Sequence, residues 1–415
     1  MEVYSTKSRG IGGRIKQRYS DFIVEEISEE NTIAEVKRFL KEDALNKATK
    51  IRVPENKNSE KDQLLCELEK YNADVNFVMA RLSRFLQVSK KRIGYAGLKD
   101  KRAITCQRIT LFSPNRERME AFESRTIDLR PLEWTEKRIE IGMLKGNRFT
   151  VTIRGIELEK KELEKTIKDF FKEADNGVAN FFGEQRFGGI RKVTHLVGKE
   201  FVKGNFKEAV MLFLTFPSER EQEDIKNARK NLLETMDFSE ASKEFPVKYR
   251  PERALIHHLC RFPNDFVGAF RNLPKHMRYL FVHAFQSHLF NRILEERIKQ
   301  GHGIKKIEGD VLEGKVPTIQ LFGFESKLSE GKAGEIEKKI LEEENTKPED
   351  FKVKAVPEVS SKGSRKPLVL VPEKMKLVEI GNDEFNENAL FAKMSFVLSK
   401  GNYATTVLRE LMKKE

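Results

Sequence analysis

The sequence predicts an α+β protein in which a β-sheet flanked by helices is interrupted by a largely helical insertion. Residues 146–154 alternate apolar and polar side chains, which is typical of a strand with one buried face. Residues from about 190 to 360 carry mostly helical patterns, and strand-like sequence returns at 367–371. Strand patterns on both sides of a helical stretch indicate one sheet domain that is divided in sequence.

The first third of the chain supplies strands and one helix. Residues 18–27 mix apolar and polar positions as a short strand does, whereas the lysine- and glutamate-rich residues 29–64 predict a helical excursion followed by an exposed loop. Asp74 is a suitable N-cap for a helix whose apolar face includes Phe85. We expect a buried strand and a glycine turn at 92–97, followed by a second strand at 104–112.

The later elements follow the same logic. A helix with apolar residues from Leu163 to Ala174 ends at Asn176-Gly177, a common C-terminal signal. Spacing from Phe281 to Ile293 predicts a core helix inside the insertion. Residues 360–364 resemble a linker, and a basic helix is expected from about Ala404.

Composition favours a cytoplasmic protein that binds nucleic acid. The 415 residues correspond to two or three domains, and 78 Lys and Arg against 65 Asp and Glu give a net charge of +13. Such an excess attracts polyanions, although many basic proteins bind no RNA. The sequence contains no long apolar run and no signal-peptide pattern, which excludes a membrane protein. Three widely spaced cysteines fit reduced thiols in a cytosol.

No cofactor or metal site is expected. The histidines form one tight cluster, at residues 257–260, and no Cys-x-x-Cys pair completes a zinc site. Residues 309–315 nearly spell a phosphate-binding loop, but Val316 stands where a hydroxyl must hold magnesium. The chain also lacks the Gly-x-Gly-x-x-Gly fingerprint of dinucleotide sites.

Asp100 is the strongest candidate for a catalytic group. It follows a predicted strand and a glycine turn and lies among Lys99, Lys101 and Arg102. Neighbouring cations favour an ionised, nucleophilic carboxylate and attract an RNA phosphate to the same place. The alternative is that Asp100 caps a turn or pairs with its lysines, which is the commoner fate of such a residue.

The sequence around Asp100 resembles a signature of the TruD family of pseudouridine synthases. Residues 95–107, Tyr-Ala-Gly-Leu-Lys-Asp-Lys-Arg-Ala-Ile-Thr-Cys-Gln, carry the resemblance. Six further segments resemble the family in the same order, at residues 21–26, 146–149, 180–188, 284–291, 363–368 and 400–410. The chain is similar to the longer, archaeal-like members, because residues 29–64 are an addition to a minimal member. Ser399 stands where the family often has proline.

The resemblance implies a fold and a catalytic set. The implied fold is the pseudouridine-synthase mixed β-sheet flanked by helices, with a catalytic domain at residues 1–181 and 363–415 and an inserted TRUD domain at residues 182–362. Asp100 matches the catalytic nucleophile and Phe149 the aromatic residue that stacks on the target base. Asn147 matches a companion that orients Asp100 or the substrate.

The implied function is isomerisation of a uridine, expected to be uridine 13 in the D arm of tRNA, to pseudouridine without a cofactor. The partner is then tRNA, with no membrane and no required protein partner. We expect RNA contacts from basic residues beside the motifs: Lys90, Lys91, Arg92, Lys99, Lys101, Arg102, Arg186, Arg191 and Lys192. The alternative is a non-catalytic RNA-binding or chaperone protein on the same fold.

Overall fold

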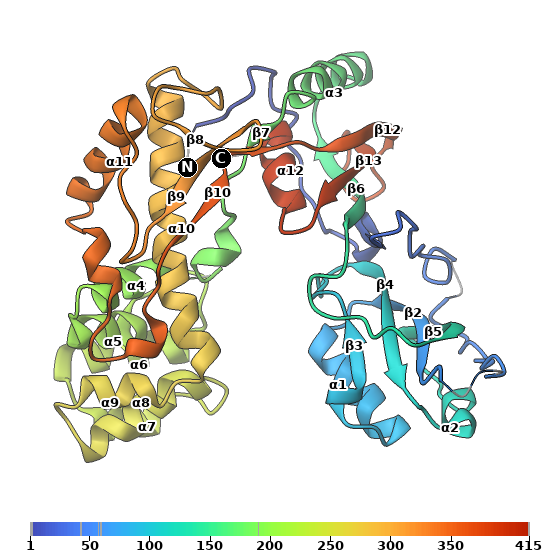
Figure 1. Ribbon diagram of the computed structural model, residues 1–415, viewed down its shortest axis with the longest axis horizontal. Helices are drawn as coiled ribbons and strands as arrows, with labels where there is room; N and C mark the ends of the chain where they lie inside the picture. Colours follow the sequence, from blue (N-terminus) through green and yellow to red (C-terminus); the bar gives the residue numbers. More distant parts are fainter. Residues whose placement is uncertain (1–2, 42–43, 57, 59, 190, 414–415) are drawn as a thin grey trace. The chain divides into compact units, whose positions relative to one another are not determined.

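The chain forms two compact units. The structure, a computed structural model, describes residues 3–41, 44–56, 58, 60–189 and 191–413. One unit, here called the sheet unit, comprises Thr6–Gly177 and Val371–Glu415; the other, the helical unit, comprises Met1–Ser5 and Val178–Leu370. Figure 1 shows both units.

A mixed β-sheet forms the centre of the sheet unit. Within the described residues its eight strands are β1 (Phe22–Ile27), β2 (Gln63–Tyr71), β3 (Ile93–Tyr95), β4 (Ile104–Phe112), β5 (Ile127–Thr135), β6 (Gly146–Ile156), β12 (Glu373–Asn382) and β13 (Leu390–Ser399). Their order is β12-β13-β6-β1-β4-β2-β5, with β3 on the side of β4. The β1–β4 pair is parallel and the other pairs are antiparallel. The predicted fold class, with a mixed sheet, is confirmed.

Helices flank this sheet as predicted (Figure 1). They are α1 (Val75–Leu86), α2 (Arg116–Glu120), α3 (Lys160–Ala174) and α12 (Ala404–Met412), with short 3-10 turns at Tyr19–Asp21 and Lys90–Arg92. Asp74 caps α1 by accepting a hydrogen bond from the Phe77 backbone N–H at 3.1 Å. The buried face of α1 packs with apolar residues of β2 and β4 in one core cluster. Phe85, expected on that face, is instead 39% exposed.

The helical excursion predicted at residues 29–64 is wrong. The described residues between β1 and β2 form turns and extended segments. The buried carboxylate of Glu69 accepts hydrogen bonds from the backbone N–H groups of residues 37–39 at 2.7–3.1 Å, and Glu25 accepts one from Val36 at 3.0 Å. These backbone groups bind strand side chains, so they cannot form the i to i−4 ladder that a helix requires.

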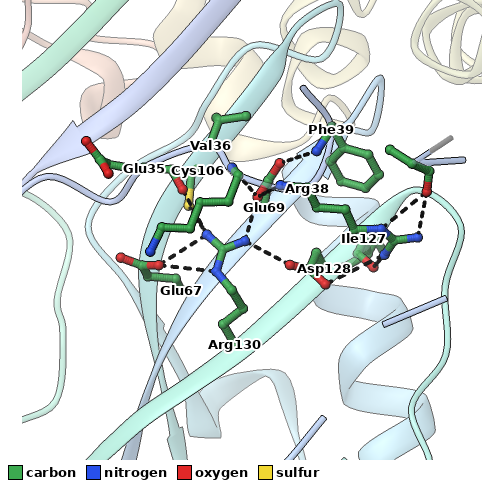
Figure 2. Close-up of polar contacts among 12 residues, drawn as sticks. Glu35, Val36, Arg38, Phe39, Glu67, Glu69, Cys106, Ile127, Asp128 and Arg130 are labelled. Atoms are coloured by element: carbon green, nitrogen blue, oxygen red, sulfur yellow. Dashed lines mark hydrogen bonds and ion pairs between the residues drawn. The ribbon is translucent and has the colours of Figure 1, made fainter. Parts of the chain in front are cut away.

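Buried charges on this side of the sheet are paired with one another. Figure 2 shows the Arg130 guanidinium among three carboxylates. Its nitrogens lie 2.5 Å from Glu69, 2.8 Å from Asp128 and 3.1 Å from Glu67. Unpaired carboxylates are costly to bury, so Arg130 makes this acidic cluster compatible with the interior.

The helical unit confirms a mostly helical middle of the chain. Its helices are α4 (Thr194–Val202), α5 (Phe206–Thr215), α6 (Glu223–Thr235), α7 (Phe238–Glu244), α8 (Arg250–Arg261), α9 (Phe266–Arg271), α10 (Lys275–Lys299) and α11 (Gly331–Glu343), with 3-10 turns at Glu184–Phe187, Pro348–Phe351 and Pro357–Val359. The predicted core helix is α10, which runs the length of the unit (Figure 1) and buries Phe281, Phe285, Leu289 and Ile293.

Two expectations for this region need correction. The unit also contains strands that the sequence pattern did not reveal, namely β7 (Val178–Ala179), β8 (Val311–Glu313) and β9 (Val316–Leu321). β8 and β9 form one small sheet with β10 (Ser364–Pro367), and β7 pairs with β11 (Val369–Leu370), which lies in the strand-like residues expected at 367–371. Residues 360–364 are no free linker, because Ser361 accepts hydrogen bonds from the Phe324 backbone and from Gln286. Through these hydrogen bonds Ser361 is part of the folded helical unit.

Candidate active site

Asp100 lies in the loop between β3 and β4 with a half-exposed carboxylate. The Lys16 ammonium donates a hydrogen bond to Asp100 Oδ1 at 3.0 Å. The Asp100 side chain is 36% exposed, whereas that of Lys16 is 16% exposed. This charge-assisted bond fixes one carboxylate oxygen and stabilises its negative charge, while the group stays open to solvent.

Three strands of the sheet bind the loop that carries Asp100. Lys99 Nζ lies 2.6 Å from Glu26 Oε2 of β1, and both side chains are 3% exposed. Lys70 Nζ of β2 donates to the backbone carbonyl of Asp100 at 2.5 Å. Gln107 Nε2 of β4 donates to the Gly97 carbonyl at 3.2 Å. We call residues 96–103 the catalytic loop.

Asn147 and Phe149 lie on the same face of the sheet as these three side chains. Asn147 pairs with Glu26 across β6 and β1, and Phe149 pairs with Val24. Residues that pair across strands project to the same side, as do residues two apart along a strand. Glu26 is therefore the cross-strand neighbour of Asn147 and also the ion-pair partner of Lys99, the residue before Asp100.

Several polar atoms on this face have no partner among the described residues. They are Asn147 Oδ1, Thr105 Oγ1 and Gln107 Oε1, all buried. Thr105 pairs with Lys70, and Gln107 follows it two residues along β4 on the same face. Buried polar atoms are nearly always hydrogen-bonded in proteins, so this group has the capacity to bind a polar ligand or water.

The Phe149 ring belongs to an aromatic cluster that reaches toward Asp100. It is 6% exposed and stacks on Phe396 of β13, with ring centres 5.7 Å apart. The rings of Phe22 and Phe149 meet edge to face with their centres 6.0 Å apart, and Lys16 Nζ lies 4.0 Å from the centre of Phe22. Phe149 is thus connected to Asp100 through Phe22 and Lys16.

The basic residues of the sheet unit that were expected to contact RNA differ in exposure. Lys101 and Arg102 are exposed beside Asp100. Lys99 is buried and ion-paired with Glu26, so the expectation that it contacts a phosphate does not fit this structure. Lys90 and Lys91 are exposed, whereas the Arg92 guanidinium lies 4.6 Å from the centre of the Phe112 ring.

The three candidates in the helical unit also differ. Arg191 is engaged internally: it donates to the Phe213 carbonyl at 2.8 Å and to Glu252 at 3.3 Å. Burial lowers the pKa of Arg191 to about 10, and a phosphate contact for this residue does not fit. Lys192 is exposed and pairs with Glu184 at 2.6 Å, and Arg186 donates to Ser287 at 3.0 Å.

Sequence reasoning missed Lys16 and Lys70. Lys16 precedes every motif and reaches Asp100 only through the fold. Lys70 carried a readable signal, because it ends the alternation of Leu64, Cys66 and Leu68, whose side chains are fully buried. A lysine at the next position of a buried face predicts a buried charge that requires a partner.

Comparison with known proteins identifies the family. The family model for tRNA pseudouridine synthase D (TruD) matches residues 1–316 and 312–411. The chain belongs to the TruD family. A relative from Methanosarcina mazei, named a probable tRNA pseudouridine synthase D, is 37% identical over 447 residues, with 100% of this chain and 96% of the relative covered. One of the same name from Methanopyrus kandleri is 40% identical over 351 residues, with 84% and 85% covered.

A solved structure agrees with this TruD assignment. The crystal structure of the TruD protein from Methanosarcina mazei is similar with a TM-score of 0.82 at 37% identity, covering 100% of this chain and 97% of that one. Within the described part of this TruD chain, no helix is long and apolar enough to cross a membrane. Among the same residues, no three His, Cys, Asp or Glu side chains gather into a group that suits a metal ion.

Proposed function

We propose that this protein is a tRNA pseudouridine synthase that isomerises uridine 13 of the D arm, with Asp100 as the nucleophile. The observation that carries the proposal is the Asp100 carboxylate itself: half-exposed, bound by Lys16 at 3.0 Å, on a loop that three strands hold. The names of the relatives support the tRNA substrate. The choice of uridine 13 rests on the resemblance of the sequence motifs to the family.

The chemistry requires a positioned carboxylate and no redox group. Asp100 attacks the target nucleoside, the bond between N1 of uracil and the ribose breaks, and the base turns. C5 then bonds to the ribose, and the bond to Asp100 breaks and restores the free carboxylate. C5 loses its hydrogen as a proton while N1 gains one, so that product and substrate contain the same atoms. Lys16 binds Oδ1 and holds the carboxylate in one orientation, which is the pre-organisation that nucleophilic catalysis needs.

The extruded base requires its own binding groups. The enzyme cannot reach a uridine that is stacked in an RNA helix, so the base must be extruded. Extrusion costs about a few kcal/mol, and stacking of the extruded base on an aromatic side chain recovers about 1–3 kcal/mol of this cost. We assign this contact to Phe149, as the motif implies. The unpartnered Asn147 Oδ1 supports a polar role for Asn147 beside the base or Asp100.

We assign the chemistry to residues 1–181 and 363–415 and an RNA-holding role to the inserted residues 182–362. The division of the structure into units at Val178 and Val371 supports this assignment. Exposed Lys101, Arg102 and Lys192 are the basic residues best placed to meet phosphates in their respective units. Their contacts fix the register of the RNA and carry no sequence information.

The test is conversion of uridine in a tRNA transcript. The wild-type protein should form pseudouridine at position 13, and Asp100→Asn should abolish the product while RNA binding survives. Asp169→Asn, which alters an exposed aspartate on α3, is the matched control and should remain active. A non-catalytic RNA-binding protein would bind the transcript and yield no pseudouridine, and full activity of Asp100→Asn would overturn the assigned nucleophile.

A further inference from the structure

Lys70 is a fully buried cation that the proposed chemistry leaves without a role. Its side chain projects from β2 toward the catalytic loop, and its ammonium donates to the backbone carbonyl of Asp100 at 2.5 Å. Lys16 binds the carboxylate of the same residue at 3.0 Å. Asp100 is therefore held twice, once at its side chain and once at its peptide.

Two other contacts of the catalytic loop do not involve the Asp100 carbonyl, which Lys70 binds. The Lys99–Glu26 ion pair fixes the preceding residue, and Gln107 binds the Gly97 carbonyl three residues upstream of Asp100. The carboxylate projects from the peptide unit that Lys70 grips. A small rotation of this peptide would move the carboxylate relative to a bound nucleoside, and misplacement by about 1 Å costs on the order of 10²-fold in rate.

We propose that Lys70 is a positioning residue for the Asp100 nucleophile, and that its positive charge holds the catalytic loop in the reactive arrangement. This inference rests on the proposed function of Asp100. A hydrogen bond from an ammonium is about twice as strong as one from a neutral amine. Removal of the charge weakens the grip on the Asp100 carbonyl while the fold of the sheet persists.

The surroundings of Lys70 place its titration within an accessible pH range. Burial lowers the pKa of Lys70 to about 8, although the negative charges of Asp100 and Asp74 oppose this shift; Lys99 adds to it. The positive charge of Lys16 is paired with the Asp100 carboxylate. Loss of a proton from Lys70 should therefore lower the catalytic rate as the pH rises through about 8.

The same titration raises the stability of the fold as the pH increases, whereas it lowers the catalytic rate. The unfolded chain keeps Lys70 protonated up to its ordinary pKa of 10.5, whereas the folded chain releases the proton near 8. Between these values the unfolded state binds more protons, so this group makes folding more favourable as the pH rises. Unfolding at high pH would lower the rate and the stability together. A rate that falls while the contribution of Lys70 to stability rises therefore cannot result from unfolding.

The experiment compares wild type with Lys70→Met and Lys413→Met. Lys413 is the matched control, because its partly buried ammonium also binds backbone carbonyls, those of Thr6 and Ser8 at 2.6 and 2.5 Å, away from the catalytic loop. Single-turnover rates on a tRNA transcript and melting temperatures are measured from pH 6 to 10. Hydrogen exchange of the amides at 97–103 is followed over the same range and corrected for intrinsic rates.

We expect the wild-type rate and the Lys413→Met rate to fall above pH 8. Lys70→Met should be at least tenfold slower at pH 7, lack that fall and bind tRNA within twofold of wild type. Its loop amides should exchange faster at every pH. Its melting temperature should fall further behind wild type as the pH rises from 8 to 10.

Two results overturn the role of Lys70: an unchanged rate and pH profile in Lys70→Met, or loop amides that exchange in wild type at the same corrected rate below and above pH 8. The wild-type measurement needs no variant, so a misfolded Lys70→Met does not rescue the proposal. If wild type forms no pseudouridine at any pH, the proposed function fails, and the exchange data still decide whether Lys70 holds the loop.

Discussion

Lys16 and Asp100, 84 residues apart in sequence, form an ion pair of 3.0 Å at the edge of the catalytic loop. Because this pair fixes the proposed nucleophile, Lys16→Met should lower the single-turnover rate by about 10²-fold. Stability should change by less than about 1 kcal/mol, since Asp100 is partly solvated. Lys168→Met, which removes an exposed pair with Glu164 on α3, should change neither quantity. A Lys16→Met rate within twofold of wild type would contradict the role given to this pair.

Phe149 is expected to serve both packing and catalysis. Phe149→Leu should cost about 1–2 kcal/mol of stability, because the ring is buried against Phe22 and Phe396. Phe170→Leu, at a fully buried position of α3, should cost a similar amount. Only Phe149→Leu should also lose activity in the fully folded protein, at least tenfold in single turnover, because a base has lost its aromatic contact. Equal activity in the two variants would show that Phe149 contributes to core packing alone.

The basic residues near the motifs should separate into RNA contacts and internal contacts. Lys101→Gln should reduce the slope of log affinity against log salt by about 1, since one phosphate contact releases roughly one counterion. Arg191→Gln should leave that slope unchanged and lower the melting temperature, because Arg191 binds Phe213 and Glu252 inside the helical unit. Filter binding at salt concentrations from about 50 to 200 mM provides the measurement. A reduced slope in Arg191→Gln would show that its internal contacts open on RNA binding.

The segment between β1 and β2 should depend on one carboxylate. Glu69→Gln should speed hydrogen exchange at residues 37–39, whose N–H groups bind Glu69, and cost about 2–4 kcal/mol of stability. Glu67→Gln removes a carboxylate that also pairs with Arg130 but, among the described residues, accepts no hydrogen bond from a backbone N–H. Exchange at 37–39 should therefore stay slow in Glu67→Gln. The same acceleration in both variants would assign the effect to Arg130 instead.

Glu344 should contribute to acid stability. Burial acts to raise its pKa, but hydrogen bonds from His288 and Lys199 outweigh this effect and lower the pKa to about 2. A depressed pKa stabilises the fold above the ordinary value of 4.5, and that contribution is lost as the pH falls toward 2. Glu344→Gln should melt at a lower temperature at pH 7 and vary less with pH between 4.5 and 2. Glu343→Gln, at an exposed neighbouring position, should keep the wild-type profile.

The sequence predicts local features of this chain well and distant contacts poorly. The cap at Asp74, the strand at 104–112 and the positions of Asp100, Asn147 and Phe149 follow from nearby residues. Lys16 reaches Asp100 only because the folded chain brings them together, and no periodicity encodes that contact. The lysine- and glutamate-rich residues 29–64 favour a helix locally, but the buried carboxylate of Glu69 takes their backbone N–H groups. Tertiary hydrogen bonds there override local propensity.

The pairing of β6 with β13 also has a consequence for the order in which the sheet unit folds during synthesis. The ribosome makes β6, with Asn147 and Phe149, before Val178–Leu370 of the helical unit, and β13 follows only afterwards. Until then β6 has one unpaired edge, and Phe149 lacks the ring of Phe396. A nascent chain that ends before residue 390 therefore carries Asp100 on an incomplete sheet. We expect activity to begin abruptly once β13 has been made and paired, and products that end before it to be aggregation-prone rather than partly active.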